Sequence, residues 1–314
     1  MNFKTVKIFF LILLLAVNIF LLVNYISSDR KSSHIDAQTI TNIVKLLDSN
    51  GITIGRDTIP DEHFTSHIIE AEFDSGYYER VAQAVSLSEK ESVNIMPDSS
   101  LKIIMKNGDQ FSLDRKFGVE YVSDGLTAIT AAEFAQMFSS KESAESLGFA
   151  VSILTGKEKK AIKAFLAPEE LTQKDSAFSY TVSSIYSNAE TKLAVCKQLI
   201  EGTEIRDHVM YVELKDGKVS RAAGMWFYIQ SSEIYSADIY DQLSVLCEEL
   251  DYKNSRFSDT DPLSSSYSIT DMSFTYCIYW NTRQDGLYFI PAWKIVTDNG
   301  ETRFYNAVNC ELYE

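Results

Sequence analysis

The sequence has few of the residues from which metal sites, disulfide frameworks and catalytic triads are built. Its 314 residues include only 4 histidines and 4 cysteines. It also has only 5 prolines and 13 glycines, which favours long regular elements over a loop-rich scaffold. Basic residues are scarce as well, 29 against 44 acidic ones, so the formal net charge is -15. A surface of this sign repels a phosphate backbone, which excludes nucleic-acid binding.

Apolar residues, by contrast, are plentiful: they make up 45% of the chain, and aromatic residues make up 12%. This composition excludes a disordered tail or a fibre, because it supplies enough apolar surface for a hydrophobic core. The length allows one large domain or two modules.

The most apolar segment is residues 6–26, in which Lys7 is the one charged side chain. At a rise of about 1.5 Å per residue, a helix of this length spans roughly 30 Å, the thickness of the hydrocarbon layer of a bilayer. The alternative is a cleaved signal peptide, whose apolar region is normally about 7 to 15 residues long and ends at small residues. Here the segment is longer and ends in Asn-Tyr-Ile-Ser-Ser at 24–28. We therefore predict a single, uncleaved transmembrane helix over 6–26.

The charges that flank this helix are nearly balanced, with Lys4 and Lys7 at its start and Arg30 and Lys31 after it. A short cytoplasmic stub is the usual arrangement for such a start. We therefore expect residues 1–5 in the cytoplasm and the bulk of the chain outside the cell membrane.

Asn18 lies near the midpoint of the predicted transmembrane helix. An unpaired amide in hydrocarbon is costly, and a partner helix satisfies it, although a lone asparagine is also often tolerated. We take Asn18 and the neighbouring Phe20 as the candidate contact with a partner in the membrane.

Periodicity predicts helices and strands along the rest of the chain. In residues 36–50 the apolar positions recur at helical spacing, and Gly51 follows as a C-terminal cap. Thr130 and Glu133 form a capping box that opens a second helix, and Ser236 is expected to cap a third. Residues 191–200 fit a strand or a short helix. Strands are expected at residues 68–73, 101–106, 110–113, 178–186, 209–214, 219–229, 273–280, 287–297 and 302–312.

Two dipeptides, Asn107-Gly108 and Asp216-Gly217, predict tight hairpin turns. A helix and a meander of strands follow one another twice along the chain. We therefore predict an α+β fold with two antiparallel-sheet-plus-helix modules, residues 32–150 and 165–314.

His63 and His67 are four residues apart, a spacing that would hold zinc on a helix. Pro60 precedes them and residues 68–69 lead into a strand, where side chains at this spacing lie roughly 13 Å apart. The sequence does not match H-E-x-x-H, and no further ligand lies nearby. We predict a surface loop here and no metal site.

Ser99 and Lys102 match the S-x-x-K motif, which supplies a nucleophile in penicillin-binding proteins, and residues 123–125 (Ser-Asp-Gly) loosely resemble a second motif of that set. The third motif, K-T-G, is absent, and Lys102 begins a predicted strand. No G-x-S-x-G is present, and residues 155–158 (Thr-Gly-Lys-Glu) lack the first glycine and the final hydroxyl of a phosphate loop. We predict no catalytic and no cofactor-binding residues.

The four cysteines all lie in the second half of the chain, at Cys196, Cys247, Cys277 and Cys310. Export makes disulfides chemically possible, and Cys277 and Cys310 lie on neighbouring predicted strands. Because the spacings match no disulfide framework, we favour isolated buried thiols, with Cys277 and Cys310 as the pair to test.

Two parts of the chain resemble a known family. They are residues 4–10 and 17–21 at the N-terminus and, near the C-terminus, Trp280, Pro291, Trp293, Asn306 and Ala307 within residues 279–281, 289–295 and 304–307. On these residues the chain resembles the YycI branch of the YycH and YycI proteins of Gram-positive bacteria. The strand with Pro291 and Trp293, followed by a turn and Asn306-Ala307, is also similar to PepSY-like domains.

This resemblance implies a non-enzymatic accessory protein of a cell-wall sensor histidine kinase in a two-component system. Such a protein would pair with a YycH-like partner outside the cell and contact the kinase through membrane helices. Two alternatives stay open: a PepSY-like exported module that binds or inhibits another protein, and an anchored cell-wall enzyme that uses Ser99 or an unrecognised carboxylate pair. Trp280 and Trp293 also have a simpler interpretation, which is packing together in the core on adjacent strands.

Overall fold

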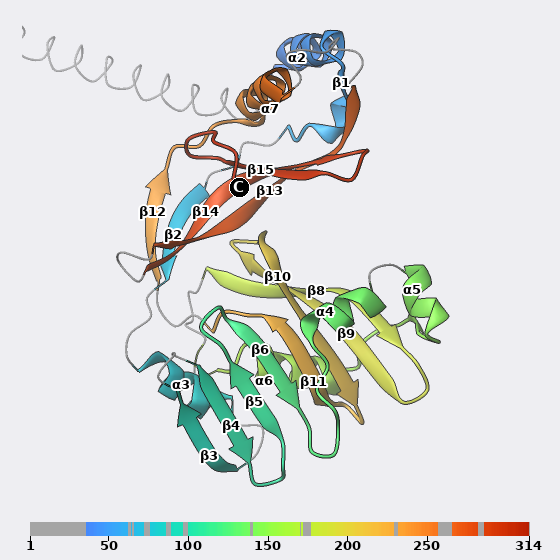
Figure 1. Ribbon diagram of the computed structural model, residues 1–314, viewed down its shortest axis with the longest axis vertical. Helices are drawn as coiled ribbons and strands as arrows, with labels where there is room; N and C mark the ends of the chain where they lie inside the picture. Colours follow the sequence, from blue (N-terminus) through green and yellow to red (C-terminus); the bar gives the residue numbers. More distant parts are fainter. Residues whose placement is uncertain are drawn as a thin grey trace, which may run out of the picture. The chain divides into compact units, whose positions relative to one another are not determined.

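The residues that the computed structural model describes form a mixed α+β structure, as predicted (Figure 1). The predicted cytoplasmic stub and transmembrane helix, residues 1–26, lie outside them. Among the residues described, no helix is long and apolar enough to cross a membrane. The described residues are 36–61, 64, 66–71, 76–85, 89–96, 100–138, 141–169, 171, 177–228, 232–256, 266–281 and 286–313.

The chain divides into two compact units, each assembled from separate segments. The terminal unit comprises the described residues up to Ser66 together with Asp238–Ser273 and Trp293–Glu314. The central unit comprises His67–Ala237 and Phe274–Ala292.

This division differs from the predicted modules 32–150 and 165–314. Strand β6 (Gly118–Val122) pairs with β11 (Lys218–Met225), so hydrogen bonds join the two predicted modules in one sheet. Strands β13 (Tyr267–Asn281) and β14 (Gly286–Thr297) each contribute residues to both units. The predicted junction was wrong because the order of helices and strands along the chain does not reveal which distant strands pair.

An antiparallel sheet forms the body of the central unit. Its strand order, over the described residues, is β3-β4-β5-β6-β11-β10-β9-β8-β7. The unit also contains β2 and β12, and β2 lies between β12 and β14 in the strand order. The bounds are β2 (Ser66–Ala71), β3 (Lys90–Ile95), β4 (Leu101–Met105), β5 (Gln110–Leu113), β7 (Ala150–Val151), β8 (Phe178–Ser187), β9 (Thr191–Ile200), β10 (Thr203–Lys215) and β12 (Ser232–Ala237).

The two predicted hairpin turns are confirmed. Asp216 and Gly217 both have positive φ, 54° and 73°, as a type I′ turn requires, and they connect β10 to β11. Gly108, with φ of 88°, lies in the turn between β4 and β5. Residues 191–200 form a strand, β9, which pairs with both β8 and β10. Of the two structures predicted for these residues, a strand or a short helix, the strand is therefore the correct one.

Helices cover both faces of this sheet. Helices α3 (Tyr77–Ala84) and α6 (Gly156–Leu166) contribute to a large core cluster on one face, while α4 (Ala131–Met137) and α5 (Lys141–Ser146) contribute to a smaller cluster on the other. Successive residues of a strand point to opposite faces. Ala222 of β11 accordingly belongs to the large cluster and its neighbour Ala223 to the small one.

Two of these helices begin with the same side-chain motif. At α4 the predicted capping box is confirmed, with Thr130 and Glu133 each bonded to the other's backbone N–H. At α6 the hydroxyl of Thr155 accepts from the N–H of Glu158 (3.3 Å), and the Glu158 carboxylate accepts from the N–H of Thr155 (2.7 Å). The second box is readable in the sequence as Thr-x-x-Glu, although no helix was predicted there.

The terminal unit begins with the predicted amphipathic helix, α2 (Ala37–Ser49). Its first turn is capped by the Asp36 carboxylate, which accepts from the N–H of Thr39 (3.2 Å). Gly51 follows with φ of 74°, a conformation that glycine adopts without a steric cost. The buried face of α2 carries Ile40 and Leu47.

The remaining elements of the terminal unit are one long helix, a short helix and strands. α2 packs against α7 (Gln242–Arg256), and the two lie side by side in Figure 1. β1 (Ile52–Ile54) pairs in parallel with β13, and β15 (Thr302–Asn306) pairs with β14; η1 (Arg56–Thr58) is a short 3₁₀ helix.

The prediction that Ser236 caps the third helix is wrong. Ser236 lies in β12, and α7 begins only at Gln242. The cap is Asp241, whose carboxylate accepts from the backbone N–H of Ser244 (2.8 Å). Aspartate and serine cap helices about equally well, so residue type alone did not separate the two positions.

A buried charge pair fastens α7 to the strands of the terminal unit. Glu249 of α7 is fully buried, and its carboxylate accepts hydrogen bonds from Arg303 Nε (3.0 Å) and Nη2 (2.5 Å). The hydroxyls of Tyr305 (2.6 Å) and Tyr267 (2.5 Å) donate to the same carboxylate. The Tyr267 and Tyr252 rings flank the guanidinium, with centroids 5.2 and 5.1 Å from its carbon. Both buried ions thus have partners that offset the free-energy cost of removing their charges from water.

Arg303 stays charged in this environment. Burial opposes the charged form, but the hydrogen bonds and the negative charge of Glu249 outweigh burial and raise the pKa of Arg303 above its usual range. The hydrogen bonds therefore join a helix, β13 and β15 through one carboxylate.

We expect Glu249→Ala to destabilise the protein by about 3–5 kcal/mol, because the change leaves the buried Arg303 charge and two tyrosine hydroxyls without their acceptor. Urea denaturation, followed by tryptophan fluorescence and circular dichroism, measures the loss. Glu248→Ala is the matched control, since Glu248 is the exposed neighbour on the same helix. Equal stability of the two variants would show that the Glu249–Arg303 pair contributes little.

Candidate functional site

The predicted C-terminal motif builds core rather than an open site. Trp293 is buried, its indole N–H donates to the Tyr240 carbonyl (2.9 Å), and its ring meets Phe64 edge-on at 5.2 Å. Trp280 is half-buried, with its ring 6.2 Å from that of Phe117. β13 and β14 are adjacent, as predicted, and each of the two tryptophans has its own aromatic partner.

The other motif residues shape the backbone around β14 and β15. Pro291 is buried in β14, beyond the residues 287–289 that pair with β2, so its missing N–H costs that pairing nothing. The Asn306 side chain accepts from the N–H of Val308 (2.8 Å) in the turn after β15. Ala307 is fully buried, and its carbonyl accepts from the N–H of Tyr240 (2.7 Å).

Several candidates from the sequence lie outside the described residues: Asn18, Phe20, His63 and Ser99. Of their companions, His67 lies on β2, where its Nδ1 is 3.2 Å from a carboxylate oxygen of Glu201. Lys102 lies on a strand, β4, as predicted, and its side chain is exposed.

The four cysteines are free thiols, so no disulfide joins Cys277 to Cys310. Cys196, Cys277 and Cys310 are buried, and Cys247 is exposed. Burial raises the pKa of Cys196 to about 12 and that of Cys277 to about 11, which leaves both thiols protonated and unreactive near neutral pH. Within the described residues, no group of three or more histidine, cysteine, aspartate or glutamate side chains is placed to hold a metal ion.

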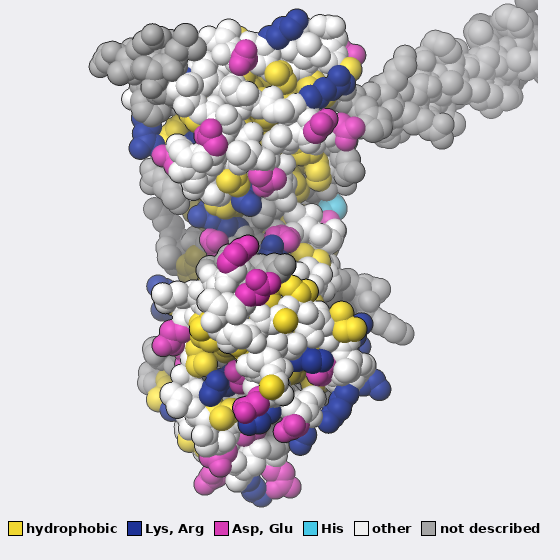
Figure 2. Space-filling model, turned by 90° about the vertical axis from the view of Figure 1, so that its right-hand side faces the viewer, with side chains coloured by type: hydrophobic (Ala, Val, Ile, Leu, Met, Phe, Trp, Pro, Cys, Tyr) yellow, Lys and Arg dark blue, Asp and Glu magenta, His cyan; other side chains and the backbone are white. Residues whose placement is uncertain are grey.

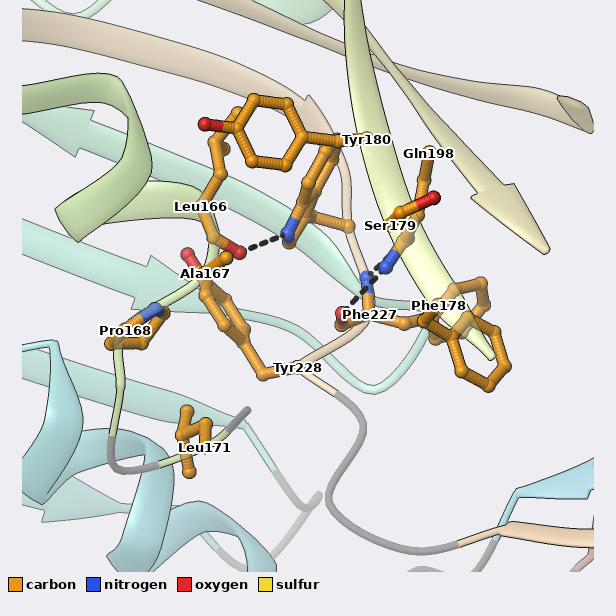
Figure 3. A pocket seen from close by; sticks show the side chains of 11 residues that line it. Leu166, Ala167, Pro168, Leu171, Phe178, Ser179, Tyr180, Gln198, Phe227 and Tyr228 are labelled. Atoms are coloured by element: carbon orange, nitrogen blue, oxygen red, sulfur yellow. Dashed lines mark hydrogen bonds between the residues drawn. The ribbon is translucent and has the colours of Figure 1, made fainter. Parts of the chain in front are cut away.

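An aromatic hollow opens between the end of α6 and strands β8 and β9, in the central unit (Figure 3). Its volume is about 40 Å³, close to the roughly 30 Å³ that one water molecule occupies in the liquid. The Trp226 indole donates to the Leu166 carbonyl (2.8 Å), and the Gln198 amide bonds both the carbonyl (2.8 Å) and the N–H (3.1 Å) of Phe227. Small-molecule sites are roughly ten times larger, so this hollow is a seam in the core rather than a ligand site.

A second, wider hollow of about 300 Å³ lies over β5, β6 and β11. Its charged side chains, Asp114 and Glu120, are exposed. The Asp114 carboxylate already accepts from the N–H groups of Lys116 (2.7 Å) and Gly118 (2.8 Å) in the β5–β6 turn. The hollow therefore has no desolvated polar group with which to select a ligand.

The described part of the central unit also contains a buried histidine that the sequence did not single out. His208 is fully buried, and neither ring nitrogen has a hydrogen-bond partner. Its ring is stacked on Phe227, with centroids 4.2 Å apart and planes 10° from parallel. It sits where β10 is irregular: Asp207 has φ of 58°, and the register with β9 shifts between Glu204 and Val209. Burial lowers the pKa of His208 to about 3, so the ring is neutral.

The surface features that sequence reasoning missed are apolar side chains on strands that end the sheet order. Val93 and Ile95 of β3, and Ile234 and Tyr235 of β12, are exposed. Beside β7, which pairs only with β8 in the described structure, Leu147, Val151 and Ile153 are exposed. The alternation of Val93 and Ile95 with polar residues is visible in the sequence, but edge position is not. Exposed apolar side chains at the unpaired edges of a sheet are typical of surfaces that bind another protein.

No protein-family model matches this chain, and no curated protein matches it. Among solved structures, the chain is similar to an uncharacterized protein from Eubacterium rectale ATCC 33656, with a TM-score of 0.42 and 11% identity over 84% of this chain and 90% of the other. This similarity is too distant to indicate a fold or a function.

We expect the neutral, buried His208 to make stability depend on pH. Its pKa is near 6.5 in the unfolded chain and about 3 in the folded one. Between these values the unfolded state binds a proton that the folded state does not, so the free energy of unfolding falls as pH falls below 6.5. The loss from pH 7.5 to pH 5 is about 2 kcal/mol for this residue.

His208→Phe, which keeps a ring against Phe227, should remove this part of the pH dependence in urea denaturation at the two pH values. His67→Phe is the matched control, because His67 is half-buried beside Glu201. An unchanged pH dependence in the His208 variant would contradict the assignment.

Proposed function

We propose that the chain is a membrane-anchored accessory protein that acts by binding other proteins, with residues 6–26 as its anchor, residues 1–5 in the cytoplasm and the bulk outside the cell. Its proposed partners are the sensor histidine kinase of a cell-wall two-component system and a YycH-like protein. The resemblance of the N- and C-terminal segments to YycI proteins supports the choice of partners. No catalytic step is assigned to it.

The observation that carries the binding role is the exposure of apolar side chains at the ends of the sheet order, on β3, β7 and β12. The two hollows also favour binding through the surface. The aromatic one has a volume of only about 40 Å³, and the one of about 300 Å³ has no buried polar group. Binding by extended surfaces suits an accessory protein that shifts a kinase between two conformations, since such a shift requires only different contacts with the two states.

Affinity purification of the full chain from membranes of the organism that encodes it tests the proposal. We expect the kinase and a YycH-like protein to be recovered with the wild-type chain. Asn18→Leu should reduce recovery of the kinase about threefold or more, because an interhelical hydrogen bond in a membrane contributes about 0.6–2 kcal/mol.

Asn24→Leu is the matched control, since Asn24 lies at the end of the predicted transmembrane helix. It should leave recovery unchanged. Failure to recover a kinase or a YycH-like protein with any of the three chains would overturn the proposal.

A further inference from the structure

The outward face of helix α6 has the opposite charge to the chain as a whole. The formal net charge of the chain is -15, yet every charged side chain that α6 exposes is a lysine. We call these residues the lysine face of α6: Lys157, Lys159, Lys160 and Lys163. The acid of the helix, Glu158, is buried. α6 therefore presents only positive charge to the solvent.

No acid among the described residues forms an ion pair with this face. The Glu158 carboxylate accepts from Lys192 Nζ (2.9 Å) on β9 and from the N–H of Thr155 (2.7 Å), so it is engaged on the buried side of the helix. Lys157 Nζ donates to a backbone carbonyl, that of Asp216 in the β10–β11 turn (2.8 Å). The positive charge of the lysine face therefore has no paired carboxylate in the described part of the chain.

The positions of these lysines oppose the stability of their own helix. α6 begins at Gly156, so Lys157, Lys159 and Lys160 lie in its first half, where the free backbone N–H groups already carry partial positive charge. Lys160 is also three residues from Lys157 and from Lys163, a spacing that makes like charges neighbours on the helix surface. A local arrangement that disfavours its own element is expected at a functional surface. A bound anion relieves both kinds of repulsion.

The helix that carries the lysine face is fixed to the sheet. Phe165 and Leu166 on its inner side belong to the large core cluster, and the Trp226 indole donates to the Leu166 carbonyl (2.8 Å). Lys215 and Lys218, which pair across the β10–β11 turn that Lys157 contacts, are exposed as well. Figure 2 shows Lys and Arg side chains gathered at the right-hand edge of the view, on the side of the sheet that lies behind it in Figure 1, where α6 is found. Because its backbone is held in place, the face loses little conformational freedom when a partner binds.

We infer that the lysine face of α6 binds a short acidic segment of a partner protein. From Lys157 to Lys163 the face extends about 9 Å along the helix axis. Its lysines stand at successive positions on a convex helix surface, so they meet separate single charges, such as a row of glutamate or aspartate side chains. A site for one phosphate group instead has donors that converge on a single point.

The charge of the whole chain decides that the bound segment is short. A long polyanion or an anionic membrane surface extends past the lysine face and meets a chain with 44 acidic and 29 basic residues, which repels it. Charges more than about 8 Å apart are largely screened at physiological ionic strength, so a segment of a few residues responds mainly to the lysines it touches. The inference goes beyond the partners proposed above, because it depends only on this face and stands whether or not a kinase is recovered.

Fluorescence anisotropy on the purified full chain in detergent tests the inference. The probe is a fluorescein-labelled peptide, Gly-Glu-Glu-Gly-Glu-Glu-Gly, and its counterpart has glutamine in place of every glutamate. The acidic peptide should bind, and more weakly as salt is raised, whereas the glutamine peptide should not bind. Lys160→Glu combined with Lys163→Glu should weaken binding of the acidic peptide about tenfold, because two attractions become repulsions.

Lys102→Glu combined with Lys116→Glu is the matched control, since both lysines are exposed elsewhere in the central unit and the net charge changes equally. This variant should bind the acidic peptide like the wild type. Because all the changed side chains are exposed, both variants should keep the circular dichroism spectrum of the wild type. No binding by the wild type, equal binding of the glutamine peptide, or equal weakening in both variants would each overturn the inference. So would sodium polyphosphate displacing the probe better than the unlabelled acidic peptide does, since the occupant would then be a phosphate polymer.

Discussion

The constraint on which the central unit depends is the two-residue period of its strands. Because neighbouring residues of β9, β10 and β11 point to opposite faces and both faces are apolar, the sheet needs a layer of helices on each side. α6 and α3 supply one layer, and α4 and α5 the other.

The terminal unit has, besides its apolar core, a buried carboxylate that joins its elements. Glu249 of α7 accepts hydrogen bonds from Tyr267 of β13 and from Arg303 and Tyr305 of β15, so it joins three segments of the chain. Such a network carries little net stabilisation compared with a well-packed apolar core. Its contribution is geometric, because a single carboxylate on α7 accepts from donors on both β13 and β15.

Local signals in the sequence predicted much of the fold. The capping box at Thr130, the Asp216-Gly217 turn and the amphipathic helix that ends before Gly51 each depend on a few neighbouring residues, and each is confirmed. Pairing between distant strands depends on contacts that no local pattern records. For that reason the module boundary was placed between β6 and β11, which are paired, and the helix cap was assigned to Ser236 instead of Asp241. The same limit applies to candidate sites. The motif at Pro291 and Trp293 was recognised but proved to lie in the core, whereas the exposure of Ile153 and the burial of His208 are properties of position rather than residue type.

The terminal unit is interleaved with the rest of the chain, and this has a consequence for how the protein is made. α2 is synthesised early, whereas α7, which packs against it, comes after the whole of the segment His67–Ala237. Until α7 has been synthesised, the apolar side chains of α2 that pack against it stay exposed. The main segment of the central unit is available to fold before that point. Loss of the segment from Trp293 onward would remove β15 and the end of β14 from the unit that contains α2, so this unit is complete only after the last segment of the chain has been made.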